Sequence, residues 1–279
     1  MKRLMRYKII SGRVVEKRDV LMDISLDPTT NKPRPRGKRK GKMVAAQIER
    51  NFREAMKRLA RILNCNCKGG DLFLSLKYDN ARLPATREEA ERIAGNFMRR
   101  ICRAYKKQTG KKLMWVLVTA DRSTKTGKPV RLHHHVVMSA VDWELISEHW
   151  PSDQFSYRRL DSSGDYTGIA KYMLQNAGYE RGKRSWRSCQ GLEKPVFTAP
   201  EPVKGAGSFR VPKEARIVER NVREDEESGF YSAYIRYVMP EGKENTEEEF
   251  LDPTRRAHPG TSCAGTSNAP KRGQRGGGS

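Results

Sequence analysis

The order of helical and strand-like segments between residues 43 and 150 restricts the fold of this chain more than any other feature of its sequence. In 43–63, apolar residues recur every three to four positions, which is the spacing of an amphipathic helix. The segments 71–78, 113–119 and 130–138 are alternating or nearly continuous apolar runs, and each of them predicts a strand. The all but uninterrupted run LMWVLVT (113–119) is typical of a central strand.

Two further helices complete this part of the pattern. Thr86 and Glu89 form a capping box, which predicts a helix that begins there and continues to about Lys107. Residues 142–150 predict a short helix. This order favours an α+β fold, with a central antiparallel β-sheet and helices packed on one of its faces, over a doubly wound fold. No Gly-rich phosphate loop follows a predicted strand, so nothing indicates an ATP-driven mechanism.

The charge of the chain indicates a polyanionic partner. The formal net charge is +23, and residues 214–251 are acidic, so the excess of cations lies mostly before residue 214. No predicted helix combines a basic face with a bulky apolar one, which favours nucleic acid over a membrane surface. A basic DNA-binding protein without catalytic activity, such as a repressor, is the alternative explanation of the charge.

The composition divides the chain into four regions. We expect a flexible basic N-terminal arm at 1–42, because KPRPRGKRKGK (32–42) holds seven cations and no apolar residue. A main domain is expected at 43–200. A C-terminal extension is expected at 201–251, in which FYSAYIRYVM (230–239) predicts a strand. Residues 252–279 are rich in Gly, Pro, Ser and Thr and are expected to be disordered. The five irregularly spaced cysteines fit reduced thiols in a cytoplasm, and no run of about 18 apolar residues predicts a membrane span.

Three of the five histidines of the chain are consecutive on the strand predicted at 130–138. Because side chains alternate along a strand, His133 and His135 are expected on one face and His134 on the other. Two imidazoles about 7 Å apart along a strand can converge on one divalent cation. The alternative is a pair of ordinary core or surface histidines.

A second segment with candidate chemistry is GIAKYMLQNAGY (168–179), which predicts a helix with one apolar and one polar half. Lys171, Tyr172 and Gln175 fall on the polar half, and Tyr172 and Gln175 are neighbours because they are three residues apart. This arrangement favours a tyrosine nucleophile beside a metal ligand, although an ordinary solvated helix face has the same pattern. Tyr166 falls on the apolar half and is expected to be structural.

In these stretches and their order, the chain resembles the HUH endonucleases, specifically the rolling-circle replication initiator (Rep) proteins of plasmids, phages and integrative elements. The likeness covers about residues 32–198. It lies in four stretches: RNFREAMKRLARILNCNCKGGDLFLSLKYDNARLP, GNFMRRICRAYKK with LMWVLVT, LHHHVVM, and IAKYMLQNAG with GKRSWRSCQGLEKP.

The resemblance implies the roles of individual residues. His133 and His135 would be metal ligands for Mg²⁺ or Mn²⁺, and Tyr172 the nucleophile, with Lys171 beside it. Gln175 is the first candidate for a third ligand, and Asp121 the second. The sequence departs from the family pattern at His134, where the family usually has a bulky apolar residue, and at Gln175, where it often has a lysine.

The implied function is replication initiation by a sequence-specific endonuclease that nicks and rejoins single-stranded DNA at an origin through a 5′-phosphotyrosine intermediate. A host helicase and polymerase are the expected further partners, and the fold implied is the HUH, RRM-like nicking domain. A relaxase or a transposase would share the nicking chemistry. The candidates for holding the DNA strand are Arg99, Arg100, Arg103, Lys106, Arg181, Lys183, Arg184, Trp186 and Arg187. Of these, Trp186 can either stack on a base or pack in a turn.

Overall fold

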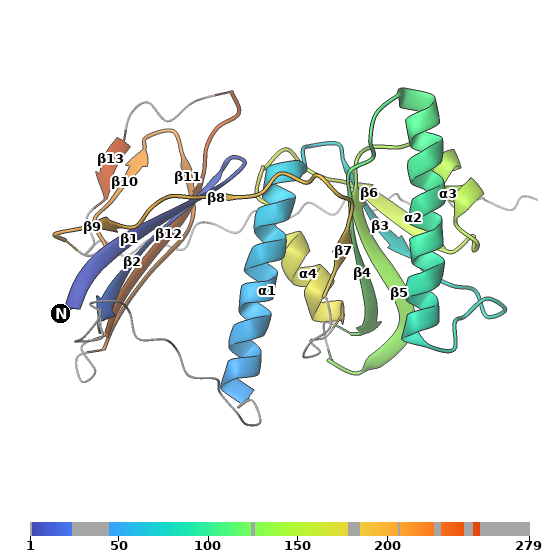
Figure 1. Cartoon of the computed structure of the whole chain (residues 1–279), viewed down its shortest axis with the longest axis horizontal. Helices are drawn as coiled ribbons and strands as arrows, with labels where there is room; N and C mark the ends of the chain where they lie inside the picture. The colour runs from blue at the N-terminus through green and yellow to red at the C-terminus, as the bar shows by residue number, and fades with distance from the viewer. Residues whose placement is uncertain are drawn as a thin grey trace, which may run out of the picture.

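The computed structural model describes residues 2–23, 45–123, 126–177, 185–205, 207–225, 230–242 and 248–251. Within these ranges the chain is α+β, with four helices and two large antiparallel sheets (Figure 1). The helices are α1 (Ala45–Asn66), α2 (Arg87–Thr109), α3 (Trp143–His149) and α4 (Thr167–Ala177). The predicted capping box is present at the start of α2, where Thr86 accepts a hydrogen bond from the backbone N–H of Glu89.

The first sheet has the strand order β6-β3-β5-β4-β7. Its strands are β3 (Leu72–Leu76), β4 (Trp115–Arg122), β5 (Pro129–Met138), β6 (Phe155–Arg159) and β7 (Arg187–Ser188). The three strands predicted from apolar runs are β3, β4 and β5, and they lie side by side at its centre with β5 in the middle. All neighbouring pairs are antiparallel, as expected.

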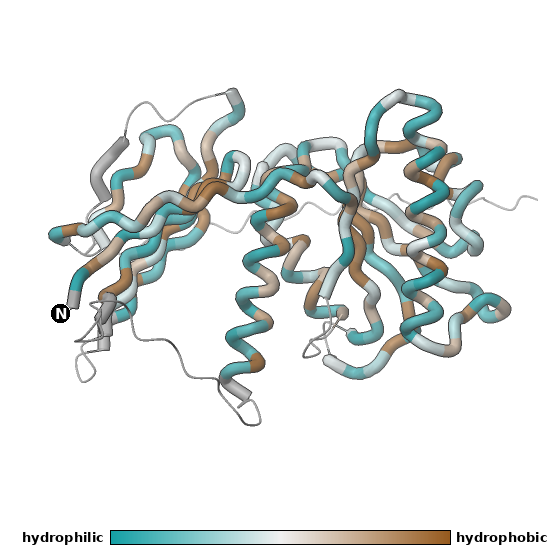
Figure 2. The backbone as a smooth tube through the Cα atoms, viewed as in Figure 1, coloured by the Kyte–Doolittle hydropathy of each residue, from teal (hydrophilic) through white to brown (hydrophobic). Residues whose placement is uncertain are grey.

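Helices cover both faces of the first sheet, so the prediction of helices on one face was wrong. Leu74 and Val136 pack in a cluster with α2 and α3. Their neighbours in the sequence, Phe73 and Val137, point to the other face and pack in a cluster with α1 and α4. Figure 1 shows α1 and α4 on the side nearer the second sheet and α2 and α3 on the far side. In Figure 2 the central strands carry long hydrophobic stretches, because both faces of these strands are buried.

The second sheet joins the two ends of the described chain. Its main path is β11-β12-β2-β1-β8, and β9 also pairs with β1. Its strands are β1 (Lys2–Ser11), β2 (Val14–Asp23), β8 (Val196–Phe197), β9 (Glu201–Pro202), β11 (Arg216–Asp225) and β12 (Phe230–Val238). The strands β10 (Phe209–Pro212) and β13 (Glu248–Leu251) form a separate pair.

This sheet corrects the predicted region boundaries. The expected flexible arm at 1–42 was wrong for residues 2–23, which form the hairpin β1–β2, while 24–44 lie outside the described residues. The strand expected near residue 230 is β12, and it pairs with β2. The extension at 201–251 therefore contributes to one sheet with the start of the chain, and the predicted tail at 252–279 lies outside the described residues.

The second sheet contacts the helices α1 and α4 of the first through polar side chains. Arg61 on α1 donates two hydrogen bonds of 2.7 Å to the carboxylate of Glu16 on β2, which also accepts from the Tyr234 hydroxyl. Arg13, in the β1–β2 turn, donates to the carbonyl oxygens of Met239 and Ser162. The turn itself approaches α1 so closely that a Cβ on Gly12, where φ is +56°, would collide with the carbonyl oxygen of a residue near the end of α1, Asn64.

We predict that Gly12→Ala destabilises the chain more than Gly110→Ala does. Both glycines have positive φ, but a Cβ on Gly110 would meet open space. The control should lose about 1 kcal/mol for the left-handed backbone alone. Gly12→Ala should lose about 1–3 kcal/mol more, because the collision forces the hairpin away from α1. Urea unfolding of the two variants measures the difference, and equal losses would show that the close approach at the turn contributes nothing.

Candidate active site

The strand β5 sends consecutive histidines to opposite faces of the first sheet. His135 is paired across the sheet with Ser75 on β3 and Val118 on β4, and it lies on the face covered by α1 and α4. His133 is paired with Ala120 and shares this face, since it is two residues away. His134 lies on the face covered by α2 and α3. This is the alternation that the sequence predicts.

His134 is a core residue with both ring nitrogens in use. It is fully buried, and its Nε2 lies 2.7 Å from the Tyr78 hydroxyl while its Nδ1 lies 3.1 Å from the Thr119 hydroxyl. Burial, with the neighbouring histidines as a smaller cause, lowers the pKa of His134 to about 3. A neutral imidazole with two hydroxyl partners has no free nitrogen for a metal, so His134 is a structural residue whose polar groups are satisfied in the core.

His133 and His135 leave one nitrogen each for a ligand. Nδ1 of His133 donates to the carbonyl oxygen of Arg131 at 2.8 Å, which leaves the lone pair on Nε2. His135 is 1% exposed, with its Nδ1 3.2 Å from the Ser75 hydroxyl, and its buried Nε2 has no hydrogen-bond partner among the described residues. Burial first, and then the charge of His133, lowers the pKa of His135 to about 3, and burial also lowers that of His133. Both rings are therefore neutral near pH 7, as metal ligation requires.

The helix α4 brings Tyr172 to this pair. The ring centroids of His133 and His135 are 4.9 Å apart, and those of His135 and Tyr172 are 5.1 Å apart. Phe73 lies beside both, stacked on His135 and edge-on to the tyrosine. The Tyr172 side chain is 40% exposed, so its ring is open to solvent even though it contacts His135. Ala170, Met173 and Leu174 are buried on the opposite side of α4, as the predicted apolar half requires.

Two cations near the histidines were missing from the sequence-based site. Arg158 on β6 places its guanidinium carbon 5.0 Å from the centre of the Phe73 ring, and its charge acts on His135. The charge of Lys77, which follows β3, acts on both His133 and His135. The alternation of β3 puts Phe73, Ser75 and Lys77 on one face and could have found the lysine. Arg158 could not be found, because β6 was not predicted.

The third metal ligand proposed from the sequence is not identified by the structure. Gln175 is exposed on α4, one turn after Tyr172. Asp121 turns to the N-terminus of α2, where Arg87 donates to its Oδ2 at 2.8 Å, while its buried Oδ1 has no hydrogen-bond partner among the described residues. Within those residues, no group of three or more His, Cys, Asp and Glu side chains is placed to hold a metal ion. Lys171, next to the tyrosine, is exposed.

Most of the predicted DNA-binding residues that the structure describes lie away from this site. Four of them lie on α2, which covers the opposite face of the sheet; these are Arg99, Arg100, Arg103 and Lys106. Arg187 on β7 donates to the carbonyl oxygen of Glu91 on the same helix. Trp186 packs against the cluster beneath α1 and α4, which is the turn-packing alternative. Arg181, Lys183 and Arg184 lie outside the described residues.

The second sheet holds the N-terminal end of the tyrosine helix. Asp165 accepts from the backbone N–H of Thr167 at 3.1 Å and so caps α4. Arg236 on β12 donates to both oxygens of Asp165, at 3.1 and 3.0 Å, and also to the Thr167 hydroxyl. The Arg236 and Asp165 side chains are only 12% and 10% exposed. Tyr166, beside this contact, is structural as expected, since it is 2% exposed and its hydroxyl donates to the carbonyl oxygen of Asp161.

Comparisons with protein-family models, curated proteins and solved structures gave no match to this chain. Among the helices that the structure describes, none combines the length and the apolar composition needed to cross a membrane.

We predict that His134→Ala lowers the free energy of unfolding by about 2–4 kcal/mol, because it opens a core cavity and removes the imidazole partner of the buried Tyr78 and Thr119 hydroxyls. His133→Ala is the matched control on the same strand. Its ring is half-buried and bonds one carbonyl oxygen, so the loss should stay below about 1 kcal/mol. Chemical denaturation of both variants measures this ranking, and the reverse order would contradict the structural role of His134.

We also predict a coupling energy of about 1–3 kcal/mol between Arg236 and Asp165, from a double-mutant cycle with Arg236→Met and Asp165→Asn. The control is the exposed pair Lys57 and Glu54 on α1, 3.3 Å apart, for which about 0.5 kcal/mol or less is expected. Urea unfolding supplies the free energies. A coupling no larger than that of the control pair would show that β12 does not hold α4.

Proposed function

We propose that the chain is a metal-dependent DNA nicking and joining enzyme of the HUH type, which initiates rolling-circle replication. One observation carries this proposal: two neutral imidazoles from one strand and a phenol from a later helix lie next to each other, with centroid separations of 4.9 and 5.1 Å. A purely structural histidine at position 135 would pair both nitrogens, as His134 does, whereas Nε2 of His135 is buried without a partner among the described residues.

The site fits a divalent cation. The Nε2 atoms of His133 and His135 would hold it, and water and phosphate oxygens would complete its coordination, with Mn²⁺ more suited to imidazole than Mg²⁺. When bound, such a cation supplies positive charge at a non-bridging oxygen of the scissile phosphate. The Ser75 hydroxyl beside Nδ1 of His135 orients the ring.

Tyr172 performs the covalent step of the proposed reaction. Its phenolic oxygen bonds to phosphorus, the bond from phosphorus to the 3′-oxygen of the preceding nucleotide breaks, and the DNA 5′ end becomes a phosphotyrosine. The proton that leaves the phenol is balanced by the proton that the released 3′-oxygen takes up from solvent. The resulting 3′-hydroxyl can prime synthesis. Because one phosphoester bond replaces another, the reverse step rejoins the strand without a nucleotide cofactor such as ATP as an energy source.

Arg158 and Lys77 give this site a positive charge that suits a DNA phosphate, since the charge of Lys77 acts on both histidines and that of Arg158 on His135. Arg158 is exposed, but its guanidinium lies over the Phe73 ring, which the Tyr172 ring also contacts. It is suited to bind the scissile phosphate through charge-assisted hydrogen bonds.

The proposed partners are single-stranded origin DNA and, since no ATP-binding loop is recognisable in the sequence, a separate host helicase and polymerase. A relaxase or a transposase would use the same nick, and the DNA sequence at the cleavage site would distinguish them.

We predict that Tyr172→Phe abolishes covalent attachment to DNA. The probe is a set of labelled single-stranded oligonucleotides tiling the DNA around the gene, incubated with the chain and Mn²⁺ and analysed on a denaturing gel. Tyr166→Phe and Tyr157→Phe are the controls, because the first phenol is buried in a structural contact and the second is exposed elsewhere on β6. Both controls should keep the adduct.

We expect His135→Ala to lose the adduct and to weaken Mn²⁺ binding, measured by the electron paramagnetic resonance of the free ion without DNA. An adduct that survives in Tyr172→Phe would assign the nucleophile to another tyrosine. A wild-type chain that forms no adduct, but binds DNA equally well after His133→Ala and Tyr172→Phe, would instead be a non-catalytic binder of the repressor type.

A further inference from the structure

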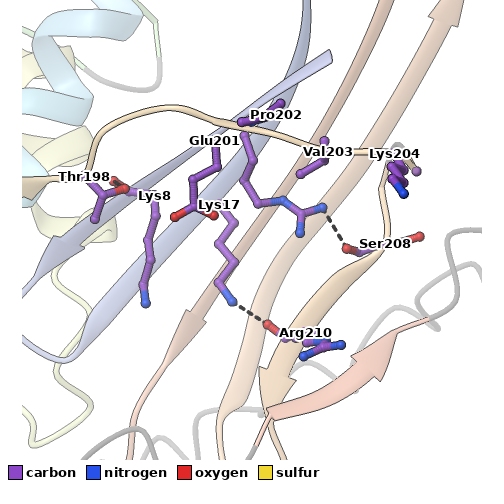
Figure 3. Close-up of a pocket in the computed structure, with 11 residues that line it drawn as sticks. Lys8, Lys17, Thr198, Glu201, Pro202, Val203, Lys204, Ser208 and Arg210 are labelled. Atoms are coloured by element: carbon purple, nitrogen blue, oxygen red, sulfur yellow. Dashed lines mark hydrogen bonds between the residues drawn. The ribbon is translucent and has the colours of Figure 1, made fainter. Parts of the chain in front are cut away.

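A pocket of roughly 570 Å³ lies on the second sheet, on the face that points away from α1. Arg6, Lys8 and Lys17 of the hairpin β1–β2 form one wall, and residues between 198 and 205 form the other, together with Ser208 and Arg210 (Figure 3). The orientation follows from the alternation of β2, because Glu16 bonds Arg61 on α1 and the next residue, Lys17, must point the opposite way. The pocket is therefore separate from the candidate active site.

The lining of the pocket is strongly cationic. Five of its eleven residues are Lys or Arg and one, Glu201, is acidic. Lys8 and Lys17 are directly opposite in the antiparallel register, an arrangement of like charges that weakens strand pairing. Lys17 is only 5% exposed, and its ammonium donates to the carbonyl oxygen of Arg210 at 2.6 Å. A bound anion would offset the cost of this arrangement.

Some of the cations are fixed and others are available. Arg6 is held by two hydrogen bonds to Asp19 and one to the carbonyl oxygen of Ser208, so it forms a rigid wall. In the part of the chain that the structure describes, the side chains of Lys8, Lys204 and Arg210 make no hydrogen bond or ion pair with other residues. Their donors are free to meet a ligand at the rim of the pocket.

We propose that this pocket binds a backbone phosphate of the DNA, at a place distinct from the nicked phosphate; the inference rests on the proposed function. Lys and Arg donors suit a phosphate. The lining contains no aromatic residue on which a base could stack, so the contact is to the backbone and independent of sequence. Arg236 ties the same sheet to α4, so DNA held in the pocket is held in a fixed position relative to Tyr172.

The test replaces the three available cations, in the variant Lys8→Gln, Lys204→Gln, Arg210→Gln. A control with the same charge change replaces Lys111, Lys112 and Lys128 with Gln, which are exposed in the loops after α2 and before β5. Binding to a 20-base-pair duplex of arbitrary sequence, and to a single strand of equal length, is measured over a range of salt concentrations in EDTA. For each phosphate that a variant no longer neutralises, the slope of log K against log salt should fall by about 0.9 for the duplex and 0.7 for the single strand.

We expect the pocket variant to neutralise about 1–3 fewer phosphates on one of the two DNA forms, and this result identifies the form that the pocket binds. The slope of the control variant should change less. Equal effects of the two variants would overturn the proposal, as would equal competition by polyglutamate at the same charge concentration. Neither the metal nor the covalent step enters this measurement, because it is made in EDTA. A slope that is unchanged in the pocket variant therefore rejects the pocket alone, and a missing covalent adduct alone rejects the proposed function.

Discussion

Burial of the strand β5 on both faces is the constraint on which the rest of the structure depends. Since α2 and α3 cover one face and α1 and α4 the other, each of three consecutive histidines has a defined environment. The two ring nitrogens of His134 lie against two hydroxyls in the core. His133 and His135 lie on the other face, where Tyr172 of α4 contacts His135 and is partly exposed to solvent. A strand with one solvated face could not place consecutive imidazoles in two such different buried environments.

The position of the tyrosine depends on a second, longer-range constraint. α4 packs by its apolar side on α1 and β4, but its N-terminal end is held by Arg236, which belongs to the second sheet. Arg61 and Glu16 join the same sheet to α1. Two ion pairs with little exposure therefore connect the basic pocket on one sheet with the histidines on the other. The proposed DNA contact on the second sheet and the proposed chemistry on the first would therefore be held in a fixed position relative to one another.

The sequence predicted the elements whose apolar periodicity is strong, and it missed those defined by distant pairing. The strands β3, β4 and β5 and the helices α1, α2 and α4 were expected near their observed bounds, as was the opposite orientation of His134. The strand β6 is five residues long and largely exposed at a sheet edge, and its alternation is limited to Phe155 and Tyr157, so Arg158 was missed. The hairpin β1–β2 has its partner β12 at the far end of the described chain, and local patterns carry no information on such a pairing.

That pairing has a consequence for how the protein is made on the ribosome. The strand β2 pairs with β12, and Arg236 of β12 is the residue that binds the cap of α4. A chain emerging from its N-terminus can assemble the first sheet and its histidines long before β12 is synthesised. The contact of Arg236 with Asp165 at the start of α4 is then among the last to form. A truncated nascent chain would carry the imidazoles and α4 without this contact.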